Sequence, residues 1–307
     1  MGNWTADDIP DLSGQTAVVT GANSGIGLPT ARELARHGAR VVGATRSAAR
    51  GEAAIEQIRA AVPGAAVEAS PLDLADLASV RRFAATVVEA HGGLDLLVNN
   101  AGVMMIPRQP TADGFELQLG TNHLGHFALT GLLLPALLAR PGARVVTVSS
   151  GMHHRGRIDF DDLMGERRYR PTRAYAQSKL ANLLFTFELQ RRVDAAGADL
   201  RAVAAHPGFA ATNLGHGGGR LIAWAVRLGQ ALRAQSAEMG ALPTLYAATA
   251  ADVAGGEYFG PDGKGEERGY PVRVPASARA RDEADAARLW EISERLTGVR
   301  FEVPATR

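Results

Sequence analysis

The chain has 307 residues, of which 46% are hydrophobic and 21% are charged, and it contains no cysteine. A chain of this size and composition can bury a sizeable core and is typical of globular proteins. The formal net charge of +1 argues against a broad basic surface that would bind nucleic acid. The lack of cysteine excludes disulfides, thiolate chemistry and cysteine-ligated metal centres, and it is compatible with the cytoplasmic location that we expect.

The N-terminal residues are polar and acidic, so they do not resemble a secretory signal. The longest apolar stretch, 127–139, covers 13 residues and contains a threonine, a glycine and a proline. Because a membrane-spanning helix needs about 20 apolar residues, this stretch predicts a buried core helix. We therefore expect no integral membrane segment.

Short apolar runs alternate with segments of helical periodicity along the chain. Strands that alternate with helices imply crossover connections and a parallel sheet with helices on both faces. The sequence thus predicts a doubly wound α/β Rossmann fold in a single domain, residues 1–307. The expected strands are 16–20, 40–45, 67–70, 95–98, 144–148, 200–205 and 257–259, and helices are expected after the first glycine-rich turn and near 48–61, 76–91, 115–139, 172–196 and 282–297.

Two segments depart from this alternation. Residues 153–171 are polar and rich in arginine, and they form an insertion between a strand and the following helix. Residues 214–240 begin with glycines and then become apolar, which is typical of a lid that closes over a substrate. The alternative for 214–240 is an ordinary surface helix with a flexible lead-in.

Tyr175 and Lys179 lie four residues apart within a predicted helix, so they share one face. A free phenol has a pKa of about 10, which is too high for a ready proton carrier near neutral pH. A neighbouring ammonium favours the phenolate, so we expect Lys179 to lower the pKa of Tyr175. The pair predicts a general acid/base.

A glycine-rich turn follows the first strand and opens the first helix. Backbone N–H groups and a helix N-terminus in such a turn can receive a pyrophosphate, although a plain strand–helix turn has the same composition. The residues expected to contact a cofactor here are Gly21, Asn23, Ser24, Gly25, Ile26 and Gly27.

About 20 residues later, dinucleotide-binding folds place either an acidic residue for the ribose 2′-hydroxyl or an arginine for a 2′-phosphate. This chain has Arg46 there and no carboxylate beside it. We therefore expect NADP(H) rather than NAD(H) as cofactor. The alternative is that Arg46 is a solvated surface charge.

Polar or small residues also follow three further strands. Asp73 and Leu74 are expected to contact the adenine, and the hydroxyl of Ser149 or Ser150 is placed to polarise a substrate carbonyl at the carboxyl edge of the sheet. The eight histidines show no metal-binding spacing, so we expect no metal. The tight turn after the strand at 95–98 adds the candidate cofactor residues Asn100, Ala101 and Gly102.

Taken in order, these motifs resemble the short-chain dehydrogenase/reductase family. The long interval from Ser150 to Tyr175, and the Ser-Lys-Leu-Ala-Asn run that ends at Asn182, are most similar to the branch of retinol dehydrogenases and protochlorophyllide reductases. The residues that carry the resemblance are Thr20 to Gly27, Asn99 to Gly102, Asn122, Ser150, Tyr175, Lys179 and His206-Pro207-Gly208.

The resemblance implies a seven-stranded, mostly parallel sheet and a catalytic tetrad completed by Asn122. Tyr175 would donate a proton to a carbonyl oxygen that Ser150 holds. Lys179 would bind the nicotinamide ribose, and Asn122 would support a water that links Lys179 to solvent. The resemblance also implies a homo-oligomer. The residues that would flank the nicotinamide are Pro207, Gly208 and Thr212.

The predicted function is NADP(H)-dependent hydride transfer between nicotinamide and the carbonyl or alcohol of a small, apolar substrate. One alternative is reduction of a carbon–carbon double bond, as in protochlorophyllide reductase, because a tyrosine can protonate carbon as well. Another is a non-catalytic NADP(H) sensor or scaffold. The complete tetrad argues against a sensor, which would not need all four residues.

Overall fold

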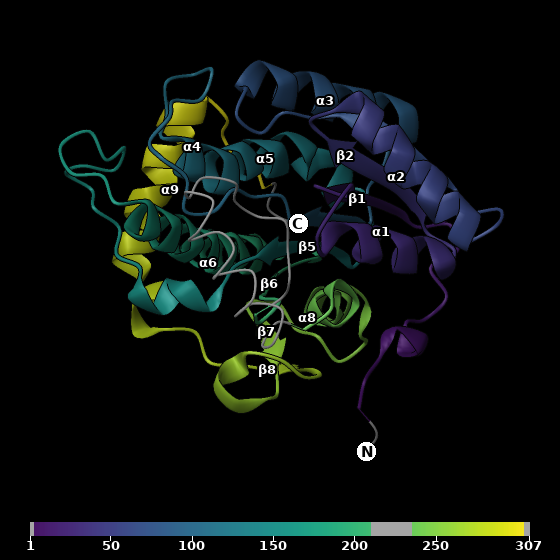
Figure 1. The fold of residues 1–307 in the computed structure, drawn as a ribbon. Helices are drawn as coiled ribbons and strands as arrows, with labels where there is room; N and C mark the ends of the chain where they lie inside the picture. Colours follow the sequence, from purple (N-terminus) through teal and green to yellow (C-terminus); the bar gives the residue numbers. More distant parts are fainter. Residues whose placement is uncertain (1–2, 210–234, 304–307) are drawn as a thin grey trace, which may run out of the picture.

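The computed structural model of the 307-residue chain describes residues 3–209 and 235–303. One eight-stranded sheet, in the order β3-β2-β1-β4-β5-β6-β7-β8, runs through the molecule, and only β8 is antiparallel to its neighbour (Figure 1). This is the expected doubly wound α/β fold. The strands are β1 (Thr16–Thr20), β2 (Arg40–Thr45), β3 (Val67–Pro71), β4 (Leu96–Asn99), β5 (Ala143–Val148), β6 (Leu200–Ala205), β7 (Tyr258–Pro261) and β8 (Pro271–Arg273).

Helices cover both faces of the sheet, because alternate strand residues point to opposite sides. In β1, Ala17 and Val19 pack toward α1, α2 and α8, whereas Val18 packs toward α3 and α5. The helices are α1 (Gly27–Arg36), α2 (Ala48–Ala61), α3 (Leu77–His91), α4 (Leu117–Leu119), α5 (Gly125–Leu138), α6 (Pro171–Ala196), α8 (Ala237–Thr249) and α9 (Glu283–Thr297). None of the helices in the described ranges is long and apolar enough to cross a membrane.

The helix ends follow local sequence signals. Pro171 begins the 26-residue helix α6, where its missing N–H costs nothing, and Gly197 ends the helix in the left-handed conformation. Asp282 and Gly298 play the corresponding N-cap and C-cap roles for α9. These signals explain why the expected helices near 172–196 and 282–297 are confirmed almost to the residue.

Two features differ from the sequence-based expectation. The strand β8 adds an eighth member to the seven expected, and it pairs antiparallel to β7 at the edge of the sheet. The helix expected over 115–139 is interrupted, because a π-helical turn over Gly120–Leu124 separates α4 from α5. A π-helical turn inserts one extra residue and occurs often at functional sites.

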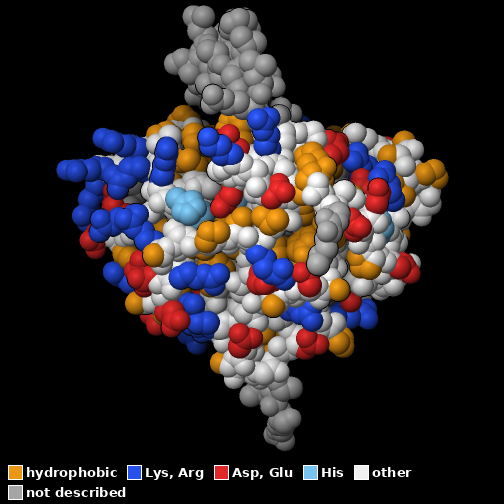
Figure 2. All heavy atoms as spheres, turned by 90° about the horizontal axis from the view of Figure 1, so that it is seen from below, with side chains coloured by type: hydrophobic (Ala, Val, Ile, Leu, Met, Phe, Trp, Pro, Cys, Tyr) orange, Lys and Arg blue, Asp and Glu red, His pale blue; other side chains and the backbone are white. Residues whose placement is uncertain are grey.

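The arginine-rich segment 153–171 continues from a 3₁₀ helix, Gly151–Arg155, and runs over the surface to the start of α6. Figure 2, which views the molecule from below the orientation of Figure 1, shows Lys and Arg side chains gathered at the left, on the side of this segment. Asp162 orders part of the segment by accepting backbone N–H bonds from Glu166, Arg167 and Arg168.

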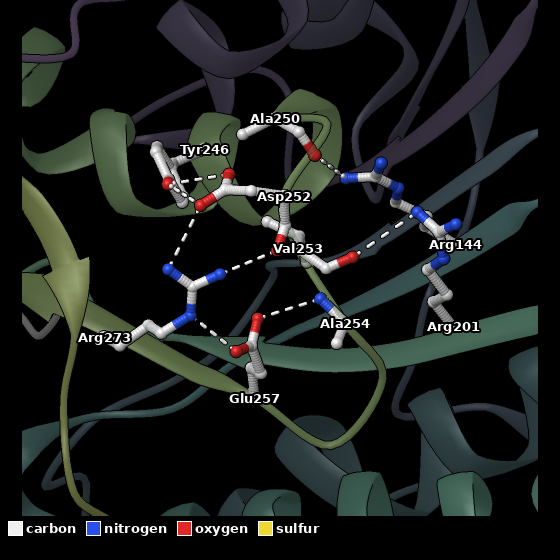
Figure 3. A network of polar contacts seen from close by, with 9 residues as sticks. All are labelled: Arg144, Arg201, Tyr246, Ala250, Asp252, Val253, Ala254, Glu257 and Arg273. Carbon is white, nitrogen blue, oxygen red and sulfur yellow. Dashed lines mark hydrogen bonds and ion pairs between the residues drawn. The ribbon is translucent and has the colours of Figure 1, made fainter.

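A network of arginines ties the loop after α8 to the sheet (Figure 3). Arg144 on β5 donates to the carbonyls of Ala250 at 2.9 Å and Ala247 at 3.2 Å, which satisfies the end of α8. Arg273 on β8 pairs with Asp252 and Glu257 and so joins the edge strand to the same loop. These contacts fix the loop between α8 and β7 against strands β5 and β8.

Replacement of Arg144 by Met should destabilise the fold. The substitution keeps the aliphatic packing but removes the Arg144 donor from two partly buried carbonyls, of which Ala250 retains only the 3.5 Å bond from the Val253 N–H, so the free energy of unfolding should fall by about 1–3 kcal/mol. Urea denaturation measures this, with the exposed Arg82→Met as the matched control. Equal denaturation midpoints for the two variants would contradict this role of Arg144.

Candidate active site

A cavity of about 1220 Å³ lies at the carboxyl ends of β1, β2, β4, β5 and β6. In open α/β sheets this edge is where ligands bind, at the point where the strand order reverses. Here the order reverses between β1 and β4. The predicted site residues that line the cavity are Gly21, Asn23, Ser24, Gly25, Ile26, Arg46, Asp73, Leu74, Asn100, Ala101, Gly102, Ser150, Tyr175, Lys179, Pro207 and Gly208.

Three predicted residues do not line this cavity. Gly27 and Asn122 are buried directly behind its wall, against Gly21 and Gly102 respectively. Thr212 lies outside the described residues, as does the predicted lid segment up to residue 234. The last residues of that segment are described, and they lead into the first turn of α8.

The glycine-rich turn between β1 and α1 has a backbone that favours glycine. Gly21 and Gly25 have φ values of +69° and +56°, which side-chain-bearing residues adopt rarely. A Cβ at Gly27 would collide with the Gly21 carbonyl, so the start of α1 packs tightly against the end of β1. The residues just before the helix line the cavity, so the N-terminus of α1 is accessible to an anion there.

One threonine joins this turn to the loop after β4. The hydroxyl of Thr20 accepts the backbone N–H bonds of Asn100 and Ala101, both at 2.9 Å. The Asn100 side chain returns a bond to the Thr20 carbonyl at 2.7 Å. These bonds hold the two loops of the switch point against each other.

Arg46 and Arg50 lie at the end of β2 and in the first turn of α2, and both line the cavity. Arg46 is exposed, and no carboxylate in residues 3–209 or 235–303 forms an ion pair with either guanidinium. The two side chains are therefore available to an anionic ligand. Sequence reasoning missed Arg50, which a search for basic residues one helical turn beyond Arg46 would have found.

Tyr175, Lys179 and Ser150 meet at the centre of the cavity wall. The helical spacing of Tyr175 and Lys179 places the Lys179 Nζ 5.8 Å from the Tyr175 ring centroid. Nζ also donates to the Val148 carbonyl at 3.0 Å. The neighbouring serine, Ser149, is buried and donates to the Lys179 carbonyl at 2.8 Å. Ser149 therefore supports α6. The Ser150 hydroxyl lines the cavity beside the Tyr175 phenol, and its oxygen also accepts the Met152 N–H at 3.2 Å.

The pKa values of this group correct one expectation. Burial raises the pKa of Tyr175 to about 12, and the hydroxyl of Ser150 beside the phenol only partly offsets this. Burial also lowers the pKa of Lys179 to about 8. The expectation that the pKa of the phenol is lowered is wrong for the protein alone, because the burial of the phenolate outweighs the pKa-lowering hydrogen bond from Ser150.

Asn122 lies in the π-helical turn and is fully buried. Its side chain bonds the N–H and the carbonyl of Val103 at 2.8 and 2.9 Å and donates to the Ser178 hydroxyl at 2.9 Å. It thus joins the loop after β4 to the helix that carries Tyr175 and Lys179.

His126 extends this network, although the sequence analysis did not select it. Burial lowers the pKa of His126 to about 4, so the ring is neutral. Its Nδ1 lies 3.0 Å from the Asn122 carbonyl, which can only accept, so Nδ1 carries the proton. Nε2, 2.9 Å from the Thr20 hydroxyl, must therefore accept. His126 connects Asn122 to the glycine-rich turn.

No group of three or more His, Asp or Glu side chains within the described part of the chain is arranged to hold a metal ion. His153 is buried, and its Nδ1 contacts the Ser150 carbonyl at 2.8 Å. His206 is buried and pairs with Glu266. Both histidines have protein partners.

The sequence matches the family model described as short chain dehydrogenase over residues 15–218. This chain belongs to the short-chain dehydrogenase family. The match covers the glycine-rich turn, Asn122, Ser150, Tyr175 and Lys179, and the fold agrees with it. The chain is accordingly an oxidoreductase by family.

Comparisons with individual proteins agree. The chain is similar to retinol dehydrogenase 13 of Homo sapiens, with 45% identity over 304 residues that cover 96% of this chain and 88% of that protein. A crystal structure from Mycobacterium paratuberculosis is 49% identical, with a TM-score of 0.83, over 98% of this chain and 100% of the other. A structure from Beutenbergia cavernae with bound NADP is 30% identical, with a TM-score of 0.62, over 81% and 95%.

Replacement of Lys179 by Met should stabilise the protein while removing a candidate catalytic group. Because burial lowers the pKa of Lys179 to about 8, the folded state disfavours the ammonium relative to the unfolded chain. We expect the variant to gain about 1–3 kcal/mol in the free energy of unfolding at pH 7.

This advantage should be full below pH 8 and should shrink as the pH rises from 8 toward 10.5, where the wild-type lysine becomes neutral in both states. Denaturation at several pH values measures it. A variant that is less stable than the wild type at pH 7 would show that the ammonium stabilises the fold.

Proposed function

We propose that this protein is an NADP(H)-dependent oxidoreductase that interconverts a carbonyl and an alcohol on an apolar small molecule. The observation that carries the proposal is the convergence of Ser150, Tyr175 and Lys179 on one wall of the cavity, opposite a glycine-rich turn that is open to an anion. The bound nicotinamide would supply or accept the hydride, and the side chains would handle the proton.

The residues that line the cavity suit a dinucleotide in their chemistry. The N-terminus of α1 and the glycines of the preceding turn would hold the pyrophosphate, and Asp73 and Leu74 would border the adenine. The Lys179 ammonium would bind the nicotinamide ribose, while Pro207 and Gly208 would flank the nicotinamide ring.

For reduction, the Tyr175 phenol would donate its proton to the carbonyl oxygen, and the Ser150 hydroxyl would hold that oxygen by a hydrogen bond. A phenol whose pKa is about 12 is a fully protonated acid at neutral pH, which suits this direction. For oxidation the phenolate is needed, and a cationic nicotinamide beside the ring would favour it. Asn122 would hold the loop and the helix at the correct separation.

The two arginines support NADP(H) over NAD(H). A 2′-phosphate adds negative charge at the end of β2, where Arg46 and Arg50 line the cavity without a carboxylate partner in the described part of the chain. An arginine binds such a phosphate through two parallel hydrogen bonds. An NAD-selective site would instead need a carboxylate for the ribose 2′-hydroxyl.

The substrate part of the cavity is largely apolar. Its wall includes three consecutive apolar residues that begin two positions after Gly102, and a methionine two residues after Ser150. Methionine side chains adapt to apolar ligands of varied shape. Together with the similarity to retinol dehydrogenase 13, this wall supports an apolar alcohol or aldehyde. The residues are Met104, Met105, Ile106, Leu117 and Met152.

Replacement of Tyr175 by Phe should abolish turnover without loss of cofactor binding. The loss of the proton donor should lower kcat at least about 100-fold, with the Kd for NADPH within about threefold of the wild type. NADPH oxidation with a panel of apolar aldehydes measures kcat. Tyr246→Phe, which removes a phenol on α8 that bonds Asp252, is the control. Equal loss of activity in both variants would contradict the role of Tyr175.

Replacement of Arg46 by Ala should lower the preference for NADPH over NADH by roughly 10–100-fold, because a charge-assisted hydrogen bond to the 2′-phosphate is lost. The ratio of kcat/KM values for the two cofactors measures this preference. Arg59→Ala, on α2 but paired with Glu56, should leave the ratio unchanged. An unchanged ratio in Arg46→Ala would contradict the assignment of NADP(H).

A further inference from the structure

The turn after β6, His206 to Phe209, is held against the connection between β7 and β8. His206 Nε2 lies 2.9 Å from the Glu266 carboxylate, and the Phe209 N–H donates to the Glu267 carbonyl at 2.6 Å. Gln235 adds a third tie, because its side chain donates to the Pro207 carbonyl at 2.6 Å and accepts from the Gly269 N–H. The turn that would flank the nicotinamide is therefore fixed from outside.

The ring of His206 has a defined orientation. Its Nδ1 accepts the N–H of Gly208 at 3.3 Å, so the proton resides on Nε2. Nε2 therefore donates to the Glu266 carboxylate, a charge-assisted bond. The two contacts make the imidazole a bridge between the backbone of the turn and the side chain of Glu266. His206 is only 2% exposed.

Two glycines make room for the contacts of the His206 ring. A Cβ at Gly260 in β7 would collide with the His206 ring, so the strand makes room for the imidazole where it passes. Gly208 has a φ of +62°, and a Cβ there would collide with the Glu267 carbonyl. Both glycines are needed for the close approach of the two segments.

Glu266 itself adopts a rare conformation. Its φ is +56°, in the left-handed region that residues with a side chain adopt at a cost, and such residues concentrate at functional sites. The conformation directs the carboxylate to a buried histidine, and the residue also lines the cavity. Within residues 3–209 and 235–303, two residues other than glycine have a positive φ, and of these Glu266 alone pairs with a histidine.

We propose that Glu266 is a positioning residue for the nicotinamide end of the cofactor: through the Nε2–H of His206 it fixes the Pro207–Gly208 turn in the conformation that receives the ring. The inference rests on the proposed binding of NADP(H). It adds a determinant that lies 60 residues from the turn in sequence, in a connection that otherwise resembles an ordinary polar loop.

The test compares the affinities of three variants for two ligands. NADPH contacts the whole site, whereas adenosine 2′,5′-bisphosphate lacks the nicotinamide and reports only on the adenosine end. Glu266→Ala removes the hydrogen-bond acceptor. Glu266→Gln keeps an oxygen that can accept from His206. Glu267→Ala removes the neighbouring carboxylate and is matched in charge to Glu266→Ala.

Fluorescence titration should show that Glu266→Ala binds NADPH roughly tenfold more weakly, while its affinity for the bisphosphate stays within about twofold of the wild type. Glu266→Gln should restore NADPH binding to within about threefold, because the amide oxygen replaces the acceptor. Glu267→Ala should weaken NADPH binding much less than Glu266→Ala does.

Three results would overturn the inference: unchanged NADPH affinity in Glu266→Ala, an equal loss for both ligands, or no rescue by Gln. The last would mean that the charge acts rather than the hydrogen bond. A wild-type protein that binds neither ligand would contradict the proposed function itself, and this inference with it.

Discussion

The site depends on one hydroxyl, that of Thr20, which holds the loops after β1 and β4 together. It accepts two backbone N–H bonds from the β4 loop and lies 2.9 Å from the neutral ring of His126. A parallel sheet fixes its strands but leaves the loops at their carboxyl ends to find other partners. Together with the bond from the Asn100 side chain to the Thr20 carbonyl, this hydroxyl anchors the two loops that border the cavity at the switch point.

Hydrogen bonds continue from Thr20 through His126 to Asn122, and from Asn122 to Ser178 on α6. The chain of bonds is buried throughout, where an unmade hydrogen bond is costly. It therefore connects the glycine-rich turn, the π-helical turn and the catalytic helix as a unit. Segments that lie far apart in the sequence thus meet at one edge of the sheet.

Burial is also the reason why the reactive residues depart from their ordinary chemistry. It raises the pKa of Tyr175 and lowers that of Lys179, so each side chain disfavours its charged form. The protein thus keeps a buried ammonium, bonded only to a carbonyl oxygen among the described residues, beside a phenol, at a cost in stability. Such a cost is common where residues serve a reaction rather than the fold.

Much of the fold could be predicted from the sequence, because the caps and apolar periodicity are local. Asp282 and Gly298 define α9, and the alternating strands and helices imply a parallel sheet. The π-helical turn around Asn122 could not be predicted, since the flanking residues have continuous helical periodicity. The short strand β8 lacks a signal of its own, because only its pairing with β7 makes it a strand.

The candidate site also combines residues that the sequence predicts with residues that it does not. Ser150, Tyr175 and Lys179 are recognisable from sequence because their chemistry requires those residue types at that spacing. His126 and Glu266 are missed, because each matters only through a partner that the fold brings close. Arg50 is also missed, although its place one helical turn beyond Arg46 is visible in the sequence. Glu266 in particular lies in a polar stretch, and its histidine partner is 60 residues away. The pKa of Tyr175 was mispredicted because burial is a property of the folded chain.

The most direct test of the account follows the hydride. The protein would be incubated with NADPH deuterated at the reactive carbon of the nicotinamide and with apolar enals, which carry both a carbonyl and a conjugated double bond. The account predicts an alcohol product with deuterium on the former carbonyl carbon. Deuterium on a carbon of the former double bond, or no transfer to any enal despite bound NADPH, would contradict it.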